Sequence, residues 1–418
     1  MKPNLNDPKQ YLIDLFLCAV DAADPMKVVA KYLPERPSGR LFVIGAGKGS
    51  ARMAQAVEAH YGPCEGFVIT RYGYSCPTQG IQIVEASHPV PDEAGEAATQ
   101  QLSTLVSNLS ASDTVIALIS GGGSALLCAP VQGISLQDKM DVNAELLASG
   151  APISEMNIVR KRLSRVKGGK LAAMCSPARL LTLMISDVPG DDPSLIASGP
   201  TIADSGSAGD ALAIIQKRNL ILPNHVVSAI VKSADGPIAL EDSDYHIVAA
   251  PSISLNAAAE LATDCDVRIL GDALEGEAND LAKQHALLAI ELQSSMAPRD
   301  RPILLLSGGE CTVTHRGQGV GGPNAEYVLS AANVLAGHKG IHVLSCDTDG
   351  VDGAAEVAGA YAGPNTIHKT KRLDLDIKYA LQLHDSHTFF EKLGDQIITG
   401  PTLTNVNDFR ALLIEHSE

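Results

Sequence analysis

The sequence lacks tryptophan and is poor in other aromatic residues. Phe, Trp and Tyr together make up only 4% of its 418 residues. The cores must therefore be built from Ala, Val, Leu and Ile, and hydrophobic residues, at 45%, are as frequent as in other globular proteins. A chain of this length is long enough for two domains, each with its own core.

Cysteine pairs are also missing. The eight cysteines are scattered singly, and no C-x-x-C spacing occurs. This distribution argues against a zinc site or a disulfide framework, and it is typical of proteins from a reducing compartment. We therefore expect a cytoplasmic protein.

The chain has few basic residues and no long apolar run. Its 32 Lys and Arg stand against 48 Asp and Glu, which gives a net charge of −16. Binding to nucleic acid or to an anionic membrane needs a basic surface, and no apolar run here is long enough to span a bilayer. The N-terminal apolar stretch, residues 11–20, contains Asp14 and lacks the basic region of a secretory signal; its spacing predicts an amphipathic helix. We expect neither nucleic acid nor a membrane as a partner, and an anionic ligand would need a local basic site.

Short apolar segments alternate with helical patterns along most of the chain. Continuous apolar strands separated by helices predict the α/β class, with a parallel sheet covered on both faces. An acidic, turn-rich stretch at residues 233–244 marks a domain boundary, so we expect domains at residues 1–238 and 239–418. The expected strands are residues 41–45, 66–70, 81–86, 114–120, 180–186, 245–249, 267–270, 302–307 and 341–346.

The first glycine-rich loop, residues 45–50 (GAGKGS), lies between a predicted strand and a predicted helix. Glycine lets the backbone approach a ligand, and the N-terminus of the following helix attracts anions. A dinucleotide fingerprint would need glycine in place of Ser50 and an acid near Arg71, at the end of the next strand. Gly47 and Lys48 therefore indicate a phosphate or carboxylate contact, and a tight turn with a solvated lysine is the alternative.

The second glycine-rich loop, residues 120–124 (SGGGS), follows the most apolar predicted strand. Successive backbone N–H groups with flanking hydroxyls suit a phosphate. The loop is not a Walker A motif, because no Gly-Lys-Ser/Thr closes it. A flexible connector is the alternative. The candidate ligand-binding residues are Gly121, Gly122, Gly123 and Ser124.

Residues 157–170 (NIVRKRLSRVKGGK) carry six cations and no acid. An apolar stripe within the segment predicts an amphipathic helix that ends at residues 168–169. A solvated helix face is the alternative, but solvated helices usually mix charges of both signs. Concentrated cations in an acidic protein indicate recognition of phosphate or carboxylate. We expect about two of the six to point inward, and the spacing does not decide which. Arg160 and Lys167 are named as candidate site residues.

An acidic motif, residues 186–193 (SDVPGDDP), follows another predicted strand. Carboxylates at a strand end can hold Mg²⁺ or accept a hydroxyl proton. Asp187 and Asp192 are the candidates, and Asp187, immediately after the strand, is the better one. Asp192 fits a helix N-cap equally well, and Asp191 fits a turn.

Two further loops follow predicted strands in the C-terminal half. Residues 307–310 (SGGE) lead through a glycine-rich stretch to Asn324, and this pattern fits either an anion cradle or a β-hairpin over residues 311–319. Glu310 and Asn324 are candidate ligand-binding residues. Residues 347–353 (DTDGVDG) fit a hard-cation site, with Asp349 and Asp352 as ligands, or an acidic surface turn. All these loops follow the carboxyl ends of strands, where open α/β sheets bind ligands, and we expect a site between the two domains.

Together these motifs resemble the class II glycerate kinases, the glycerate 2-kinase family with a MOFRL C-terminal domain, some members of which are labelled hydroxypyruvate reductases. The resemblance covers nearly the whole chain. It implies a Rossmann-like N-terminal domain, a smaller α/β C-terminal domain, and transfer of the γ-phosphoryl group of ATP to the 2-hydroxyl of D-glycerate, with Mg²⁺. The motifs that carry it are GAGKGSARMA, SHPVPDEAG, SGGGSALL, NIVRKRLSRVKGGKLA, SDVPGDDPSLIASGPT, LSGGECTVT, DTDGVDGAAEVAGA and GPTLTNVNDFRALLI.

The resemblance also implies roles for individual residues. Lys48 corresponds to the lysine that stabilises the transferred phosphoryl group, and the glycines of residues 121–123 correspond to the phosphate or substrate loop of the family. Asp187 and Asp192 match its acidic SDVxGDDP motif, and Asp349 and Asp352 match its acidic MOFRL loop. One departure concerns residues 319–326, which read GVGGPNAE where the family reads close to GRGGRNQE. Arginine is the natural partner of carboxylate and phosphate. Either another cation replaces the two arginines, or the acceptor differs from glycerate.

Three functions fit these observations. The first is the kinase, in which the glycine loops and Lys48 hold phosphates, cations of residues 160–170 bind the acceptor carboxylate, and a carboxylate takes the hydroxyl proton. The second is an NAD(P)H-dependent reductase of hydroxypyruvate or tartronate semialdehyde, which the incomplete fingerprint disfavours. The third is a ligand-binding relative without activity. The expected partners are ATP and a small hydroxy acid, and a homodimer is expected.

Overall fold

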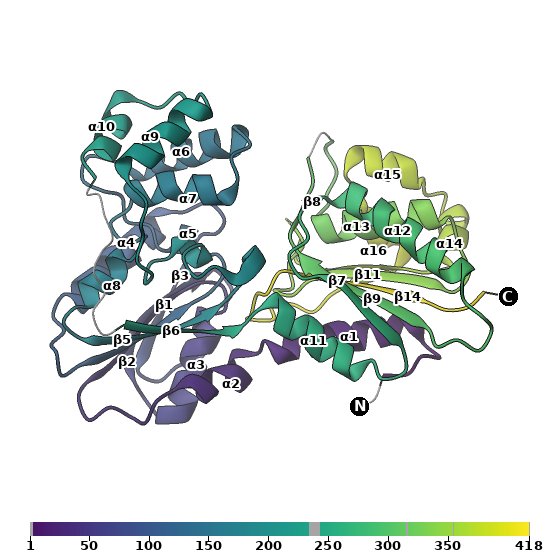
Figure 1. Cartoon of the computed structure of the whole chain (residues 1–418), viewed down its shortest axis with the longest axis horizontal. Helices are drawn as coiled ribbons and strands as arrows, with labels where there is room; N and C mark the ends of the chain where they lie inside the picture. The colour runs from purple at the N-terminus through teal and green to yellow at the C-terminus, as the bar shows by residue number, and fades with distance from the viewer. Residues whose placement is uncertain (1–2, 234–242, 315–316, 354, 418) are drawn as a thin grey trace. The chain divides into compact units, whose positions relative to one another are not determined.

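The computed structural model describes residues 3–233, 243–314, 317–353 and 355–417. The chain divides into two compact units (Figure 1), an N-terminal unit of Pro25–Val248 and a C-terminal unit that combines Met1–Asp24 with Ala249–Glu418. The boundary expected after residue 238 lies outside the described residues. The sequence-based division also assigned residues 1–24 to the first domain, whereas their contacts lie in the C-terminal unit.

The sheet of the N-terminal unit has six strands in the order β3-β2-β1-β4-β5-β6. The pairings β3–β2, β2–β1, β1–β4 and β4–β5 are all parallel. This order, with α3 packed against β1 and β2 and with α4 and α8 contributing to the main core of the unit, is that of a Rossmann-like sheet. The predicted α/β class and Rossmann-like fold are confirmed.

The strands of this unit are β1 (Leu41–Ala46), β2 (Glu65–Arg71), β3 (Ile81–Ala86), β4 (Thr114–Ile119), β5 (Arg179–Ile185) and β6 (Ser243–Ala249). Its α-helices are α2 (Pro25–Val28), α3 (Ser50–Tyr61), α4 (Glu93–Val106), α5 (Gly123–Leu126), α6 (Leu136–Ala148), α7 (Ile153–Arg162), α8 (Lys170–Cys175), α9 (Ala208–Lys217) and α10 (Asn224–Val231). Its 3₁₀ helices are η1 (Val29–Tyr32), η2 (Pro189–Asp191) and η3 (Ile196–Ser198). Helices α6, α7, α9 and α10 pack around a small core of their own.

The basic segment does not form the single helix expected up to residues 168–169. Helix α7 ends at Arg162, because the chain then pairs with residues 129–131: the N–H of Val131 donates to Leu163 O, and the N–H of Arg165 donates to Ala129 O. Lys167 therefore lies in a loop between α7 and α8 and not on a helix.

The second sheet, in the C-terminal unit, has the order β13-β12-β11-β14-β9-β7 and mixed strand directions. Strand β14 is antiparallel to both of its neighbours, whereas β7 and β9 are parallel. The elements are α1 (Pro8–Ala22), α11 (Pro251–Leu261), β7 (Asp266–Gly271), β8 (Gly276–Glu277), α12 (Ala278–Ser294), β9 (Ile303–Gly309), β10 (Cys311–Thr312), α13 (Pro323–Leu335), β11 (Ile341–Asp347), β12 (Gly359–Ala362), α14 (Thr366–Arg372), α15 (Ile377–Leu383), α16 (Ser386–Leu393), β13 (Gln396–Ile397) and β14 (Asp408–Ile414).

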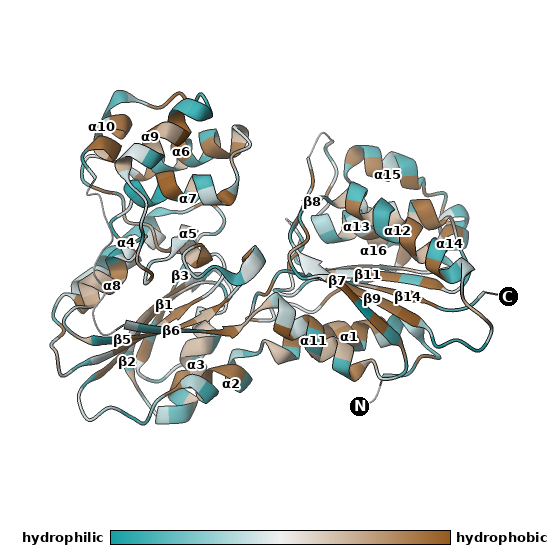
Figure 2. Ribbon diagram, viewed as in Figure 1, coloured by the Kyte–Doolittle hydropathy of each residue, from teal (hydrophilic) through white to brown (hydrophobic). Residues whose placement is uncertain are grey.

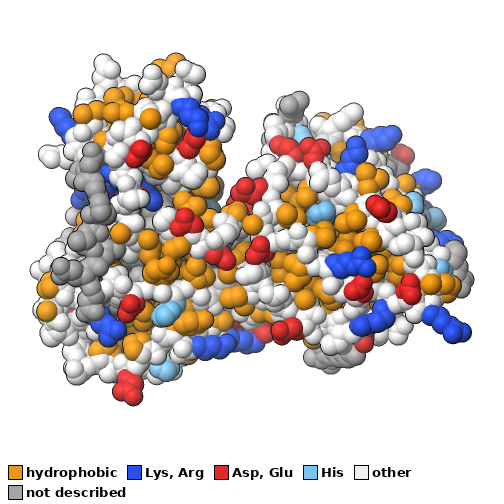
Figure 3. Space-filling model, viewed as in Figure 1, with side chains coloured by type: hydrophobic (Ala, Val, Ile, Leu, Met, Phe, Trp, Pro, Cys, Tyr) orange, Lys and Arg blue, Asp and Glu red, His pale blue; other side chains and the backbone are white. Residues whose placement is uncertain are grey.

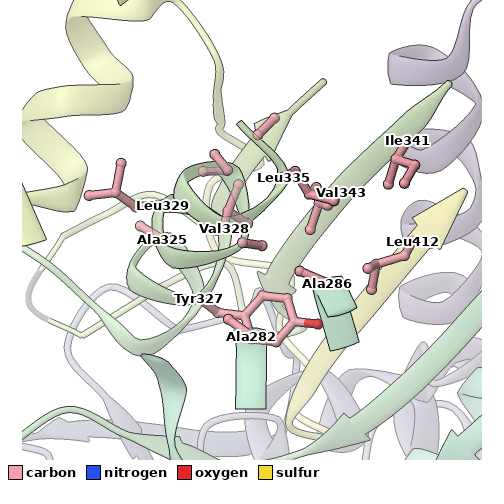
Figure 4. Packing of buried hydrophobic residues seen from close by; sticks show 14 of the residues in the cluster. Ala282, Ala286, Ala325, Tyr327, Val328, Leu329, Leu335, Ile341, Val343 and Leu412 are labelled. Carbon is pink, nitrogen blue, oxygen red and sulfur yellow. The ribbon is translucent and has the colours of Figure 1, made fainter. Parts of the chain in front are cut away.

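Helices cover both faces of the second sheet. On one face α12 and α13 pack against the strands, and Figure 4 shows residues of α13 beside Ala286 of α12 and beside Val343 and Leu412 of the sheet. On the other face lie α1 and α11, and the buried residues of α1 include Tyr11 and Phe16. The amphipathic helix predicted from residues 11–20 is thus confirmed. Figure 2 shows that the strands are largely hydrophobic.

Charged side chains of both signs are scattered over the surface (Figure 3). On the face drawn in Figure 3, Lys and Arg side chains are dispersed among acidic and neutral ones. Among the described residues, no helix is both long enough and apolar enough to cross a membrane.

Candidate functional site

The two glycine-rich loops of the N-terminal unit meet at one edge of its sheet. Strands β1 and β4 are neighbours, and the strand order reverses between them, which is where open α/β sheets form a ligand crevice. The N–H of Lys48 donates to Gly121 O at 2.8 Å, and the N–H of Gly49 donates to Ser120 Oγ at 2.9 Å. These contacts place the two loops side by side.

Glycine is required at the centre of the second loop for two reasons. A Cβ on Gly123 would lie 2.7 Å from the Cβ of Ala197 and 2.8 Å from Ala46 O, which are closer than real Cβ contacts. Gly122 has a φ of 79°, and a Cβ there would lie 3.0 Å from His88 Cδ2 and 3.2 Å from Lys48 Cγ. Gly123 is therefore explained by packing, whereas Gly122 lies directly against the side chains of Lys48 and His88. His88 was not among the predicted site residues, although it belongs to the SHPVPDEAG motif.

A hydrogen-bonded series of side chains extends from the second loop toward the basic segment. Lys167 Nζ donates to Ser124 O at 2.5 Å and to Ser124 Oγ at 3.0 Å. Ser124 Oγ lies 2.9 Å from Ser198 Oγ, and Ser198 Oγ donates to Asn157 Oδ1, also at 2.9 Å. Ser198 is held in η3 with a φ of 63°, in the left-handed region. Residues of α5, η3 and α7 thus fix the position of the Lys167 amine. Ser198 and Asn157 were missed as candidates, because only the fold brings them to Ser124.

Most cations of residues 157–170 are occupied by structural contacts. Lys161 Nζ lies 3.1 Å from Asp204 Oδ1, and Arg162 pairs with the other oxygen of the same carboxylate. Lys170 Nζ donates to two backbone carbonyl oxygens, and Arg165 donates to Pro130 O and to a glutamine side chain. The remaining two are Arg160 and Lys167, the two candidates named from the sequence.

Arg160 and Lys167 form a cation cluster together with Lys139 of α6. Lys139 Nζ lies 3.7 Å from Cys128 Sγ, and Arg160 donates to the side-chain oxygen of Asn143. Within the described part of the chain, the hydrogen bonds of these three cations go to neutral atoms and not to carboxylates. The spacing pattern in the sequence contained no signal for Lys139, which lies outside the basic segment.

Electrostatics in the cation cluster disfavour positive charge and so favour an anionic ligand. Burial lowers the pKa of Arg160 to about 10 and lowers the pKa of Lys139. Burial, and then the charge of Lys139, lower the pKa of Lys167 well below its ordinary value. An anion placed among the three side chains would relieve this repulsion.

The two acidic candidates of the N-terminal unit differ in their surroundings. Asp187 is half-buried and follows β5, which is the neighbour of β4, so it lies at the same edge of the sheet as the glycine loops. Asp192 is exposed, and its Oδ1 accepts the N–H of Ser194 at 2.9 Å, as a turn or cap residue does. A single carboxylate at this edge fits Mg²⁺, which keeps several waters and is commonly bound by one or two carboxylates and by substrate phosphates.

The candidates of the C-terminal unit are engaged in internal hydrogen bonds. The carboxylate of Asp352 accepts the N–H groups of Asn324 (2.9 Å) and Ala325 (2.8 Å), so it caps the N-terminus of α13, and it also lies 3.0 Å from His387 Nε2. The Asn324 side chain donates to Asp352 and Asp408. Asp349, which is 2% exposed, accepts the N–H of Val351.

Glu310 is exposed after β9. Among the described residues, no group of three or more His, Cys, Asp or Glu side chains is arranged to hold a metal ion.

The glycine-rich stretch before α13 is explained by close packing. A Cβ on Gly317 would lie 2.2 Å from Leu383 O, and a Cβ on Gly322 would lie 2.4 Å from the Asp352 carboxyl carbon. The β-hairpin considered for residues 311–319 is not formed in the described part, because β10 pairs in parallel with β8. The glycine-rich stretch leads directly into helix α13.

Comparison with known proteins adds two family matches. Residues 11–231 match the domain of unknown function DUF4147, and residues 303–408 match the MOFRL family. The D-glycerate 2-kinase of Thermotoga maritima is 36% identical over 405 residues, which cover 96% of this chain and 97% of that protein. A protein of Agrobacterium vitis named "Putative hydroxypyruvate reductase" is 48% identical over 413 residues, which cover 97% of this chain and 94% of that protein.

A solved structure extends the similarity to the fold. The crystal structure of a glycerate kinase from Thermotoga maritima has a TM-score of 0.87 and 36% sequence identity, and the match covers 98% of this chain and 100% of that one.

Proposed function

Because this chain belongs to the glycerate 2-kinase family, the family with a DUF4147 and a MOFRL domain, we propose that it transfers the γ-phosphoryl group of ATP to D-glycerate. The acceptor atom in this proposal is the 2-hydroxyl, and the product is 2-phosphoglycerate. The observation that supports it best is the cation cluster of Lys139, Arg160 and Lys167. Its hydrogen bonds go to neutral atoms, and Lys167 contacts Ser124 of the second glycine loop.

Phosphoryl transfer depends mainly on positioning and on neutralising charge. In the proposed site, Lys48 and the backbone N–H groups of Gly121, Gly122 and Gly123 bind the phosphates of ATP. Asp187 would hold Mg²⁺ together with these phosphates, and the ion would neutralise part of their charge. Ser124 takes part by holding the Lys167 amine.

The acceptor carboxylate binds the cation cluster in this proposal. Arginine offers a fork of donors that matches a carboxylate, and Arg160 is half-buried, so it is accessible from one side. These cations come from α6, α7 and the loop after α7, and none depends on residues 320 and 323, where the family has arginine. This supports the first of the two alternatives, in which other cations replace the missing arginines. The prediction that the site lies between the two units, with Glu310 and Asn324 contributing, stays a prediction.

A reductase is the second candidate, because the Agrobacterium vitis relative carries that name. Two observations speak against a dinucleotide at the first glycine loop. The third glycine of the fingerprint is replaced by Ser50, which is buried and whose hydroxyl donates to Leu118 O at 2.9 Å. At the end of β2, where an acid would bind the ribose, the chain has Arg71.

Activity and binding assays on one purified preparation distinguish these functions. We expect ADP release that depends on D-glycerate, Mg²⁺ and ATP, with the phosphorus resonance of 2-phosphoglycerate in the product. Loss of NADH with hydroxypyruvate, and no ADP release, would replace the kinase with the reductase. Binding of glycerate without either reaction would indicate a ligand-binding relative. None of the eight cysteines forms a disulfide bond, which fits the proposed cytoplasmic location.

A further inference from the structure

The Lys167 amine is buried, and two hydrogen bonds fix its orientation. The side chain is 2% exposed, and its Nζ donates two hydrogen bonds, both to Ser124. An ammonium group has three N–H donors, whereas a neutral amine has two and a lone pair. Ser124 therefore uses both donors of the neutral amine, and the remaining direction carries the lone pair.

The hydroxyl series fixes Ser124 as an acceptor toward Lys167. Ser198 donates its only hydroxyl proton to Asn157 Oδ1, so it accepts the proton of Ser124. Ser124 Oγ then has lone pairs, and no proton, to offer to Lys167. Lys167 must donate to Ser124 and cannot use its lone pair there.

The charges around Lys167 favour the neutral amine in the free protein. The groups that face it are Lys139 on α6, Arg160 on α7 and Cys128 after α5, and the described hydrogen-bond partners of Lys167 include no carboxylate. Burial and the cations lower the pKa of Lys167 well below its ordinary value. Arg160 stays protonated at neutral pH, because its pKa of about 10 is still high enough.

We propose that Lys167 is the catalytic base of the reaction, and that it accepts the proton of the acceptor hydroxyl while Arg160 and Lys139 bind the acceptor carboxylate. This inference rests on the proposed kinase function, and it replaces the carboxylate that the sequence led us to expect as base.

The proton and electron transfers balance. The hydroxyl O–H bond breaks, the proton goes to the Lys167 lone pair, and the oxygen forms a bond to the γ-phosphorus. The bond from that phosphorus to the bridging oxygen breaks, and its electron pair leaves with ADP. The resulting ammonium group later loses its proton to solvent. The arriving carboxylate favours this ammonium, because an opposite charge nearby stabilises the charged form.

The test compares Lys167→Arg with Lys170→Arg. A guanidinium keeps the positive charge but cannot accept a proton at neutral pH, whereas Lys170 contacts only backbone carbonyl oxygens among its described partners and serves as the matched control. For Lys167→Arg we expect kcat to fall at least about a hundredfold, the scale of general-base catalysis. Binding of D-glycerate, measured by calorimetry with a non-hydrolysable ATP analogue, should change far less. Lys170→Arg should keep wild-type kcat.

The pH profile gives a second readout. In the wild type, kcat/KM should fall toward low pH as the Lys167 amine becomes protonated, and this limb should persist in Lys170→Arg. In Lys167→Ala, added ethylamine should restore turnover in proportion to its free-base fraction, which would support the proposal even if Lys167→Arg does not fold.

Near wild-type kcat in Lys167→Arg, or failure of amines to rescue a folded Lys167→Ala, would overturn the base role. So would a loss of glycerate binding as large as the loss of kcat, because Lys167 would then act only in binding. A wild type that releases no ADP with D-glycerate would instead refute the kinase function itself, and this result is separate from every outcome with the variants.

Discussion

The cations of the basic segment differ in what they contact and not in how they are spaced. Lys161 and Arg162 share the Asp204 carboxylate, whereas Lys167 donates to Ser124, a residue 43 positions away in sequence. The same side-chain type therefore has a structural role at one position and a proposed functional role six positions later. The deciding factor is whether a carboxylate lies within reach.

At the level of single residues, Lys48 is the most direct test of the phosphate site. Its backbone is fixed by the hydrogen bond to Gly121, so Lys48→Ala removes the ammonium without moving the loop. We expect turnover to drop at least about a hundredfold, comparable to the loss of one preorganised donor in other active sites. The melting temperature should stay close to that of the wild type. Lys217→Ala, at an exposed ion pair, is the control, and near-normal turnover of Lys48→Ala would remove that residue from the mechanism.

For Asp204 we expect the opposite of the result for Lys48, namely a loss of stability, because the substitution leaves buried charges unbalanced. Lys161 and Arg162 are each 4% exposed, and Asp204→Asn removes the negative charge that both cations share. We expect the free energy of unfolding, measured with urea, to decrease by about 3–5 kcal/mol. Glu155→Gln breaks the more exposed pairs with Lys217 and Arg218 and should have a much smaller effect. Equal effects of the two substitutions would contradict the buried role of Asp204.

The ion pairs of Asp204 with Lys161 and Arg162 also predict that the free energy of unfolding depends on pH. Burial raises the pKa of Asp204, but Lys161 and Arg162 lower it more, so the native pKa lies below its ordinary value. The native carboxyl therefore binds fewer protons than the unfolded one, and its contribution to stability is present above the unfolded pKa of about 3.9. The contribution disappears as the pH falls through the native value. The difference in unfolding free energy between wild type and Asp204→Asn should accordingly narrow from pH 7 toward pH 3.

At the level of elements, helix α13 depends on a carboxylate from another segment. Its N-cap, Gly322, has no side chain to accept a hydrogen bond, and Asp352 accepts two N–H groups of the first turn instead. This arrangement explains why an acid of the DTDGVDG motif is completely buried.

Substitution of Asp352, compared with removal of metal ions, distinguishes a helix-capping role of this residue from a metal-binding role. Asp352→Ala should lower the free energy of unfolding by about 2 kcal/mol or more, because it removes a cap and leaves buried N–H groups without an acceptor. EDTA should leave the unfolding midpoint of the wild type unchanged. If EDTA destabilised the wild type as much as the substitution does, Asp352 would be a metal ligand.

At the level of the whole molecule, the chain order and the spatial units differ. The first helix, α1, packs against α11 and the strands of the C-terminal unit, so a unit formed mostly by the last 170 residues is completed by the first 24. The N-terminal helix therefore supplies part of the core of a unit that is synthesised last.

This organisation can be tested on α1 itself. Phe16 is fully buried and packs near Phe409, with ring centroids 5.9 Å apart, whereas Leu17 is 44% exposed. Phe16→Ala should destabilise the C-terminal unit by about 3–5 kcal/mol, the usual loss for a buried aromatic side chain. Leu17→Ala should have little effect on the urea midpoint. Similar small effects of both substitutions would mean that α1 does not complete that core.

The sequence by itself determined nine of the strands, β1 to β7, β9 and β11, together with the glycine turns and the acidic and basic clusters of this protein; β12, β13 and β14 were not predicted. The apolar run at residues 81–86 coincides with β3, because periodicity and turn residues act over short distances. Only the tertiary structure decided the end of α7, the position of β14 between β9 and β11, and the assignment of α1 to the C-terminal unit. It also decided which cations face Ser124 and which face Asp204. These choices depend on contacts between residues far apart in the chain, and local pattern carries no information about them.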